Sequence, residues 1–151
     1  AGGKWLAGGQ TLLGSMKLRL ASPEQIVDLG GVKDLAGVRK EGNALVIGAM
    51  TRHADVARHA DVRATIPALA QLADGIGDRQ VRAMGTLGGS VANNDPAADY
   101  PAAVLGLGAT VITSARQIAL AWCWRRLNGP RPRLRAMPWK PRNEPSNRGV
   151  A

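Results

Sequence analysis

Cysteine and aromatic side chains are scarce in this sequence. Among 151 residues there is no Phe, one Tyr and one Cys. A single cysteine, Cys123, excludes an internal disulfide and an iron–sulfur cluster held by four cysteines of these residues. Any hydrophobic core must therefore be built from Leu, Ile, Val and Ala. No uninterrupted apolar run reaches the ~18 residues of a membrane helix, so the sequence predicts no membrane span.

The two histidines do not form a metal-binding pair. His53 and His59 are six residues apart on a predicted helix and therefore lie on different faces of it. We expect both to be surface residues. No Ser, His or Cys lies near an acidic residue in the pattern of a nucleophile and its base, so the sequence predicts no catalytic acid/base pair.

The net charge of +9 is concentrated at the C-terminal end. Residues 1–120 carry twelve basic and ten acidic side chains, whereas 121–151 carry eight basic and one acidic, with three tryptophans. Such a segment could bind nucleic acid through phosphate contacts and base stacking. We favour the alternative that it arises from a shifted reading frame, because its prolines forbid a helix and interrupt any strand. The sequence predicts a disordered basic tail over 121–151.

The N-terminal part of the chain predicts two short strands. The first covers Trp5–Ala7 and ends at a Gly-Gly pair. Ser22 and Pro23 are typical of a helix start, and Gln25 would complete a capping box for about one turn of helix. A short buried strand is expected over 26–29.

A hairpin and a helix follow in the pattern of residues 38–59. The strand from Val38 should turn at 41–43 and return over Ala44–Ala49. We expect Thr51 to cap the helix that comes next.

The remaining predicted elements are two helices and a strand. Pro67 opens a helix over 67–77, whose apolar residues recur at helical spacing. Asp95 is expected to cap a second helix that begins at Pro96, and 109–113 predicts a strand. Together these elements indicate a mixed α/β (α+β) fold whose sheet is at least partly antiparallel.

Two glycine pairs in the sequence could bind a phosphate group through their main-chain N–H groups. They occur in "LAGGQTLL", residues 6–13, and in "TLGGS", residues 86–90. Glycine lets main-chain N–H groups approach a ligand closely, and hydroxyls add further donors, as suits a pyrophosphate. The pairs match neither a dinucleotide-binding nor a P-loop motif, and a glycine pair is most often only a turn. Asp99 is explained equally well as a first-turn charge on its helix.

The motifs taken together are more specific. The sequence contains A-G-G-Q, V-I-G-A-M-T, Q-V-R and T-L-G-G-S followed by D-P-A-A-D, in order, between about Lys4 and Gln117. It thereby resembles the FAD-binding medium subunit of the molybdenum hydroxylases, such as carbon monoxide, xanthine and aldehyde dehydrogenases. The resemblance implies a two-subdomain FAD-binding fold in which both glycine loops belong to one FAD site.

The resemblance also implies site residues and domain limits. The positions that match cofactor-binding positions of the family are Ala7, Gly8, Gly9, Gln10, Thr11, Leu12, Ile76, Thr86, Leu87, Gly88, Gly89, Ser90 and Asp99. Residues 1–35 would form part of the first FAD subdomain and 36–120 part of the second. Residues 121–151 would lie outside the family fold, as a truncated and frameshifted end.

The implied function is that of an oxidoreductase subunit in the cytoplasm. It would relay electrons from iron–sulfur clusters on a small partner subunit to FAD and then to an external acceptor. Molybdenum would be held by a large partner subunit. Two alternatives are a basic nucleic-acid-binding protein that acts through its tail, and an inactive gene remnant.

Overall fold

The computed structural model describes residues 3–119 and 133–135. The elements are, in chain order, β1 (Gly3–Leu6), α1 (Leu12–Lys17), β2 (Gln25–Asp28), the 3-10 helix η1 (Lys33–Leu35), β3 (Val38–Glu41), β4 (Ala44–Ile47), α2 (His53–Arg58), α3 (Ala60–Thr65), α4 (Pro67–Gly75), α5 (Arg79–Met84), α6 (Leu87–Asn93), α7 (Asp99–Gly106), β5 (Thr110–Ile112), β6 (Gln117–Ala119) and β7 (Arg133–Arg135).

The strands form two separate sheets. β1 and β2 pair in parallel, and the other strands form a five-stranded sheet in the order β3-β4-β7-β5-β6. This sheet is antiparallel at β3–β4 and β5–β6, and parallel where β7 lies between β4 and β5. The mixed α/β (α+β) class predicted from the sequence is therefore confirmed, including its antiparallel component.

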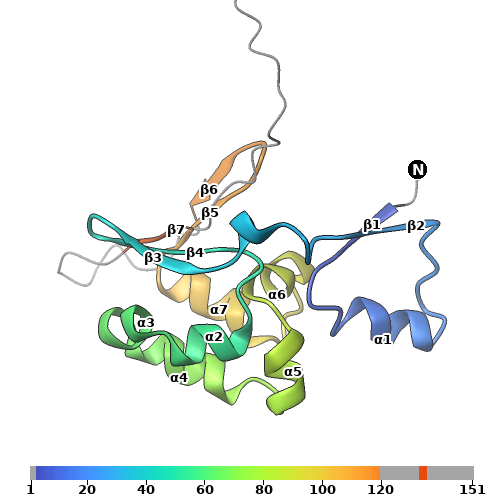
Figure 1. Cartoon of the computed structure of the whole chain (residues 1–151), viewed down its shortest axis with the longest axis horizontal. Coiled ribbons are helices and arrows are strands. Elements are labelled where there is room, and N and C mark those ends of the chain that lie inside the picture. The colour runs from blue at the N-terminus through green and yellow to red at the C-terminus, as the bar shows by residue number, and fades with distance from the viewer. Residues whose placement is uncertain (1–2, 120–132, 136–151) are drawn as a thin grey trace, which may run out of the picture.

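β1, α1 and β2 make a small N-terminal unit beside the larger body (Figure 1). The predicted turn of helix after Ser22 is wrong, because the chain enters β2 directly at Gln25. Pairing with β1 favours the extended backbone over one helical turn, which is costly to nucleate. The strand expected over 26–29 is present, but its burial is not. All residues of β2 are exposed, since within the described residues this strand pairs only with β1.

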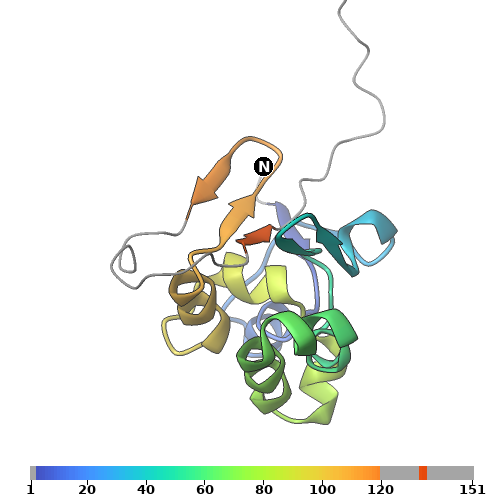
Figure 2. The same cartoon turned by 90° about the vertical axis from the view of Figure 1, so that its left-hand side faces the viewer.

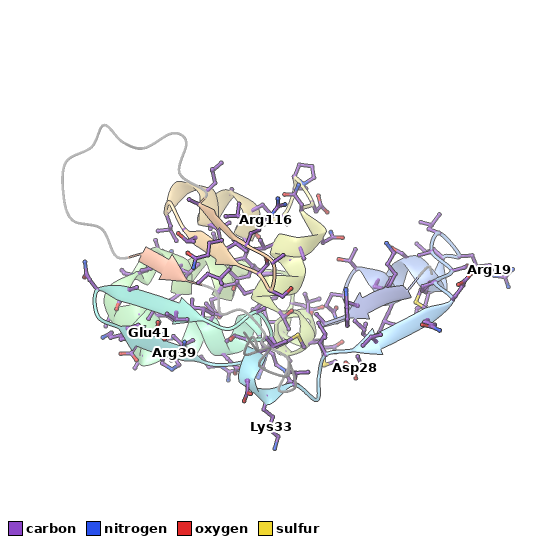
Figure 3. The ribbon with its side chains drawn as sticks, turned by 90° about the horizontal axis from the view of Figure 1, so that it is seen from above. Arg19, Asp28, Lys33, Arg39, Glu41 and Arg116 are labelled. Carbon is purple, nitrogen blue, oxygen red and sulfur yellow. The ribbon has the colours of Figure 1, made fainter. Side chains whose placement is uncertain are left out.

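The predicted hairpin is confirmed as β3 and β4. Gly42 and Asn43 connect the strands, and Gly42 has a φ of +58°, which glycine adopts without strain. Exposed Arg39 and Glu41 form an ion pair near the tip, at the end of the molecule away from Arg19 and Asp28 (Figure 3). The side chains of β4 from Leu45 to Ile47 are buried.

The helices α2, α3 and α4 pack together on one side of the β3–β4 hairpin (Figures 1 and 2). Pro67 is the first residue of α4, as predicted, since its fixed φ suits that position. The core is aliphatic except for one tyrosine. It comprises Leu45, Ile47, Val56, Ala57, Val62, Ile66, Leu69, Ala70, Ala73, Leu87, Tyr100, Val104 and Ala109.

Two predicted helix caps are wrong. α2 has Arg52 at its N-cap, and the buried hydroxyl of Thr51 instead accepts from the Gly37 N–H at 2.9 Å and donates to the Gly37 carbonyl at 3.0 Å. Asp95 accepts from the Ala97 N–H in a turn, and the helix α7 begins only at Asp99. In both places a short polar side chain satisfies a nearby loop rather than the helix.

The C-terminal segment contributes one described strand, β7, although the sequence predicted a tail without strands. β7 pairs with β4 over three residues and with β5 at Thr110, so it satisfies strand edges that would otherwise lack partners. Cys123 and the tail tryptophans lie outside the described residues. Among the described residues, no helix has the length and apolar character needed to cross a membrane.

Candidate functional site

The first glycine loop connects β1 to α1. Gly9 has a φ of +75°, a conformation that favours glycine, and its carbonyl accepts from the Leu13 N–H as the chain enters the helix. The N–H groups of Gly8, Gly9, Gln10 and Thr11 donate no hydrogen bond to any other described residue. Four consecutive main-chain donors therefore have no partner among the described residues, and their use by an anion stays a prediction.

The second glycine loop is the start of the helix α6. Thr86 is its buried N-cap, with 4% of its surface exposed. The N–H groups of the first turn all donate within the protein: Leu87 to the Thr51 carbonyl at 3.0 Å, Gly88 to the Ala49 carbonyl at 2.8 Å, Gly89 to Thr86 Oγ1 at 3.2 Å and Ser90 to the Thr86 carbonyl at 3.1 Å. The expectation that both loops offer free N–H groups is therefore wrong for the second. Two of its donors fix α6 to residues 49 and 51, and the other two close the first turn of α6 on Thr86.

The structure brings the two glycine loops into contact, although about eighty residues separate them. A Cβ on Gly8 would lie 2.3 Å from the Met84 carbonyl oxygen and 2.7 Å from Gly85 Cα. A Cβ on Gly89 would lie 3.4 Å from the Ala7 Cβ. The absence of a side chain at Gly8 thus permits the close approach of the two backbones.

A third segment, residues 48–51, supports the second loop and was not predicted as part of the site. Its carbonyl groups at Ala49 and Thr51 receive the N–H groups of α6. Gly88 packs directly on it, since a Cβ there would lie 2.5 Å from the Ala49 Cβ. The sequence marks this segment by the motif V-I-G-A-M-T. Its role as a support could not be predicted, because it depends on contacts with residues far away in the chain.

Ile76 follows α4, and Asp99 is the first residue of α7. Ile76 is half-buried against the core at the end of α4, and its carbonyl accepts from Arg82 Nη1 at 3.0 Å. Asp99 is exposed in the first turn of α7, where a negative charge is favourable. Among the described residues, no hydrogen bond joins either of these two residues to the glycine loops.

His53 is buried, which contradicts the expectation of a surface histidine. It is only 5% exposed, and its ring lies 5.2 Å from that of Tyr100, between centroids. Burial lowers the pKa of His53 below its usual value of 6.5, so its neutral form is favoured. His59 is partly exposed, and its Nδ1 accepts from the Asp61 N–H at the start of α3.

An apolar cavity of about 670 Å³ adjoins the second loop. It lies between α6, α7 and the strands β5 and β6, and residues from each contribute to its walls. Leu87 and Gly88 of the second loop form part of its lining. No residue of the first loop is part of this lining.

Two features of this region bear on ligand binding, namely the first glycine loop and the apolar cavity beside the second. Among residues 3–119 and 133–135 there is no group of three or more potential metal ligands. The N–H groups of the first loop have no partner among the described residues, and small residues lie beside them, as the binding of a phosphate group by main-chain donors requires. These features fit the pyrophosphate of a dinucleotide.

Comparison with known proteins gives one family. Residues 2–121 match the model of the FAD-binding domain in molybdopterin dehydrogenases. The match ends where the basic tail begins, so it lends no support to a nucleic-acid-binding role.

Individual relatives agree with this match. The chain is 42% identical over 110 residues to the glyceraldehyde dehydrogenase medium chain of Sulfolobus acidocaldarius, covering 73% of this chain and 39% of that protein. It is 46% identical over 99 residues to the carbon monoxide dehydrogenase medium chain of Hydrogenophaga pseudoflava, covering 66% of this chain and 34% of that protein.

A solved structure shows the same fold. The carbon monoxide dehydrogenase of Hydrogenophaga pseudoflava, in a form that lacks the molybdenum-pyranopterin moiety of its cofactor, superposes with a TM-score of 0.70 at 44% identity. The superposition covers 72% of this chain and 38% of that one. The chain thus spans under two fifths of the length of these relatives.

Proposed function

Because the chain belongs to the family of FAD-binding domains in molybdopterin dehydrogenases, we propose that it is an FAD-binding electron-transfer component of a molybdenum hydroxylase. The contact between the two glycine loops carries this proposal. Gly8 lies against Met84 and Gly85, so that the free N–H groups of one loop stand beside the small residues of the other.

The loops would hold FAD in different ways. The first, with Ala7, Gly8, Gly9, Gln10, Thr11 and Leu12, would donate main-chain hydrogen bonds to the pyrophosphate. The second, with Thr86, Leu87, Gly88, Gly89 and Ser90, would form a rigid small-residue wall. Ile76 and Asp99 would complete the site with an apolar and an acidic group. When bound, FAD would supply the redox chemistry, taking electrons from iron–sulfur clusters and passing them to an external acceptor.

Other subunits would supply the remaining centres. The relatives are named medium chains, which supports assembly with a large molybdenum-binding and a small iron–sulfur subunit. A cytoplasmic location belongs to the same proposal. So does the division into partial FAD subdomains at 1–35 and 36–120, followed by a separate segment at 121–151.

Calorimetric titration of the 151-residue chain with FAD tests the proposal. We expect saturable binding of one FAD per chain, abolished by Gly89→Val. A Cβ at Gly89 would lie 2.8 Å from Thr86 Oγ1, and the larger valine would also press on Ala7 and push the loops apart. Gly31→Val is the matched control, because nothing lies within 4 Å of a Cβ there.

Two results would count against the proposal. If the unaltered chain takes up no FAD while its thermal transition is cooperative, the chain is not a flavin-binding component. If Gly89→Val binds FAD as tightly as Gly31→Val does, the second loop is not part of the site.

A further inference from the structure

The ring of His53 supports the start of the second glycine loop. The main chain of His53 is also bonded there, since its backbone N–H donates to the Gly85 carbonyl at 3.0 Å. A Cβ on Gly85 would lie 2.5 Å from His53 Nε2, so the imidazole fills the space that a side chain at residue 85 would occupy. Displacement of this ring would therefore move the backbone that enters α6.

Tyr100 lies behind His53 on a different helix. It belongs to α7, is fully buried, and follows Asp99 directly. The two rings are tilted by 42° at a centroid distance of 5.2 Å. Together they form a buried pair, defined as His53 and Tyr100, that connects α2 and the second loop to α7.

Each member of the buried pair has a polar atom without a partner. Among the described residues, neither His53 Nδ1 nor the Tyr100 hydroxyl forms a hydrogen bond, although both atoms are inaccessible to solvent. An unpaired buried polar atom is unfavourable, and the surrounding core is aliphatic. Packing alone would be served better by Leu and Phe at these positions.

The protonation states of the pair are complementary. Burial lowers the pKa of His53, so Nδ1 of the neutral ring can accept a hydrogen bond. Burial, together with the nearby charge of Asp99, raises the pKa of the Tyr100 hydroxyl, which keeps its proton and can donate. A water molecule needs at least two polar partners to occupy an otherwise apolar interior, and this pair offers two.

We propose that His53 and Tyr100 are positioning residues for the FAD site, joined through one enclosed water between Nδ1 and the hydroxyl. The link holds Gly85 and the first turn of α6 at a constant distance from α7 and Asp99. This inference rests on the proposed function, because the loop that the link holds is the small-residue wall of the proposed FAD site. Neither residue touches the cofactor in this proposal.

The test compares Tyr100→Phe, His53→Leu and the double variant in the full chain. The first removes only the hydroxyl, and the control is His59→Asn, which keeps a capping side chain at the other histidine. Amide hydrogen exchange is followed at Leu87 and Gly88, and the FAD dissociation constant is measured for each variant.

We expect exchange at both amides to become about tenfold faster in each single variant, and FAD affinity to fall about tenfold, as for loss of one buried hydrogen bond. The double variant should differ from either single one by less than twofold, because both changes break the same link. The proposal would be overturned if the effects of the two single variants were additive in the double variant. It would also be overturned if amide exchange were unchanged in Tyr100→Phe. The exchange measurement decides this even if no variant binds FAD or if His53→Leu does not fold.

Discussion

Replacement of Gly8 by alanine should separate the two glycine loops. The substitution adds one methyl group at a position whose φ is open to alanine, so its effect comes from contact and not from backbone strain. That methyl carbon would lie 2.3 Å from the Met84 carbonyl oxygen, whereas ordinary contact begins at 3.4 Å. Because both neighbours are backbone, they cannot rotate away, and the loop must move by about 1 Å.

The magnitude follows from this displacement. Overpacking at a close contact lowers the free energy of unfolding by about 1–3 kcal/mol. A shift of about 1 Å also misaligns the N–H groups of the first loop with a bound phosphate, and each hydrogen bond to a charged group contributes about 1.5–3 kcal/mol. Loss of one such bond corresponds to about a 10- to 150-fold rise in the FAD dissociation constant.

Urea denaturation and FAD titration measure the two effects separately. Gly14→Ala is the matched control in the same unit, since nothing lies within 4 Å of a Cβ there. Gly14 is inside α1, so alanine should raise stability by about 0.5–1 kcal/mol. If Gly8→Ala has the stability and FAD affinity of the unaltered chain, the loops are not in the contact described here, and the reasoning fails.

Three further changes test the supports of the site. Thr51→Val removes both hydrogen bonds to Gly37 and should lower the free energy of unfolding by about 1–3 kcal/mol in urea, while Thr51→Ser should stay near the original value. Asp78→Ala removes the cap that accepts two N–H groups of α5 and should cost about 1 kcal/mol by the same assay; Asp78→Asn should recover most of it. The lowered pKa of His53 means that the unfolded chain binds a proton that the folded chain excludes, so stability should fall as the pH drops below about 6.5. His53→Leu should have a smaller fall in thermal midpoint from pH 7 to pH 5.5, and an identical fall would contradict the assignment.

Local patterns in the sequence were sufficient for several elements. The hairpin of β3 and β4 follows from the turn residues at 41–43 between two short runs, and the φ of +58° at Gly42 is a local requirement. The helix α4 follows from Pro67 and the spacing of its apolar residues. The two glycine loops could also be recognised as candidate phosphate-binding segments, and the ordered motifs between them carried the resemblance to the family.

The hydrogen-bond partners of some polar residues could not be predicted from their neighbours in the sequence. Thr51 and Asp95 both have the character of helix caps, yet each bonds to a loop instead. The free energy of one side-chain hydrogen bond is nearly the same in either place, so the choice falls to the packing of the remaining chain. For the same reason a capping signal at Ser22 did not prevent the chain from pairing in β2.

Burial and proximity were decided only by the tertiary structure. Histidine is a polar residue type that is expected at the surface. The ring of His53 is nevertheless buried, because it packs between Gly85 and Tyr100. The contact of Gly8 with Met84 joins segments that no periodicity relates. The sequence determines which short segments can bend closely or bind an anion, because those properties depend on neighbouring residues. Which of them meet depends on the whole core, since close packing couples positions that are distant along the chain.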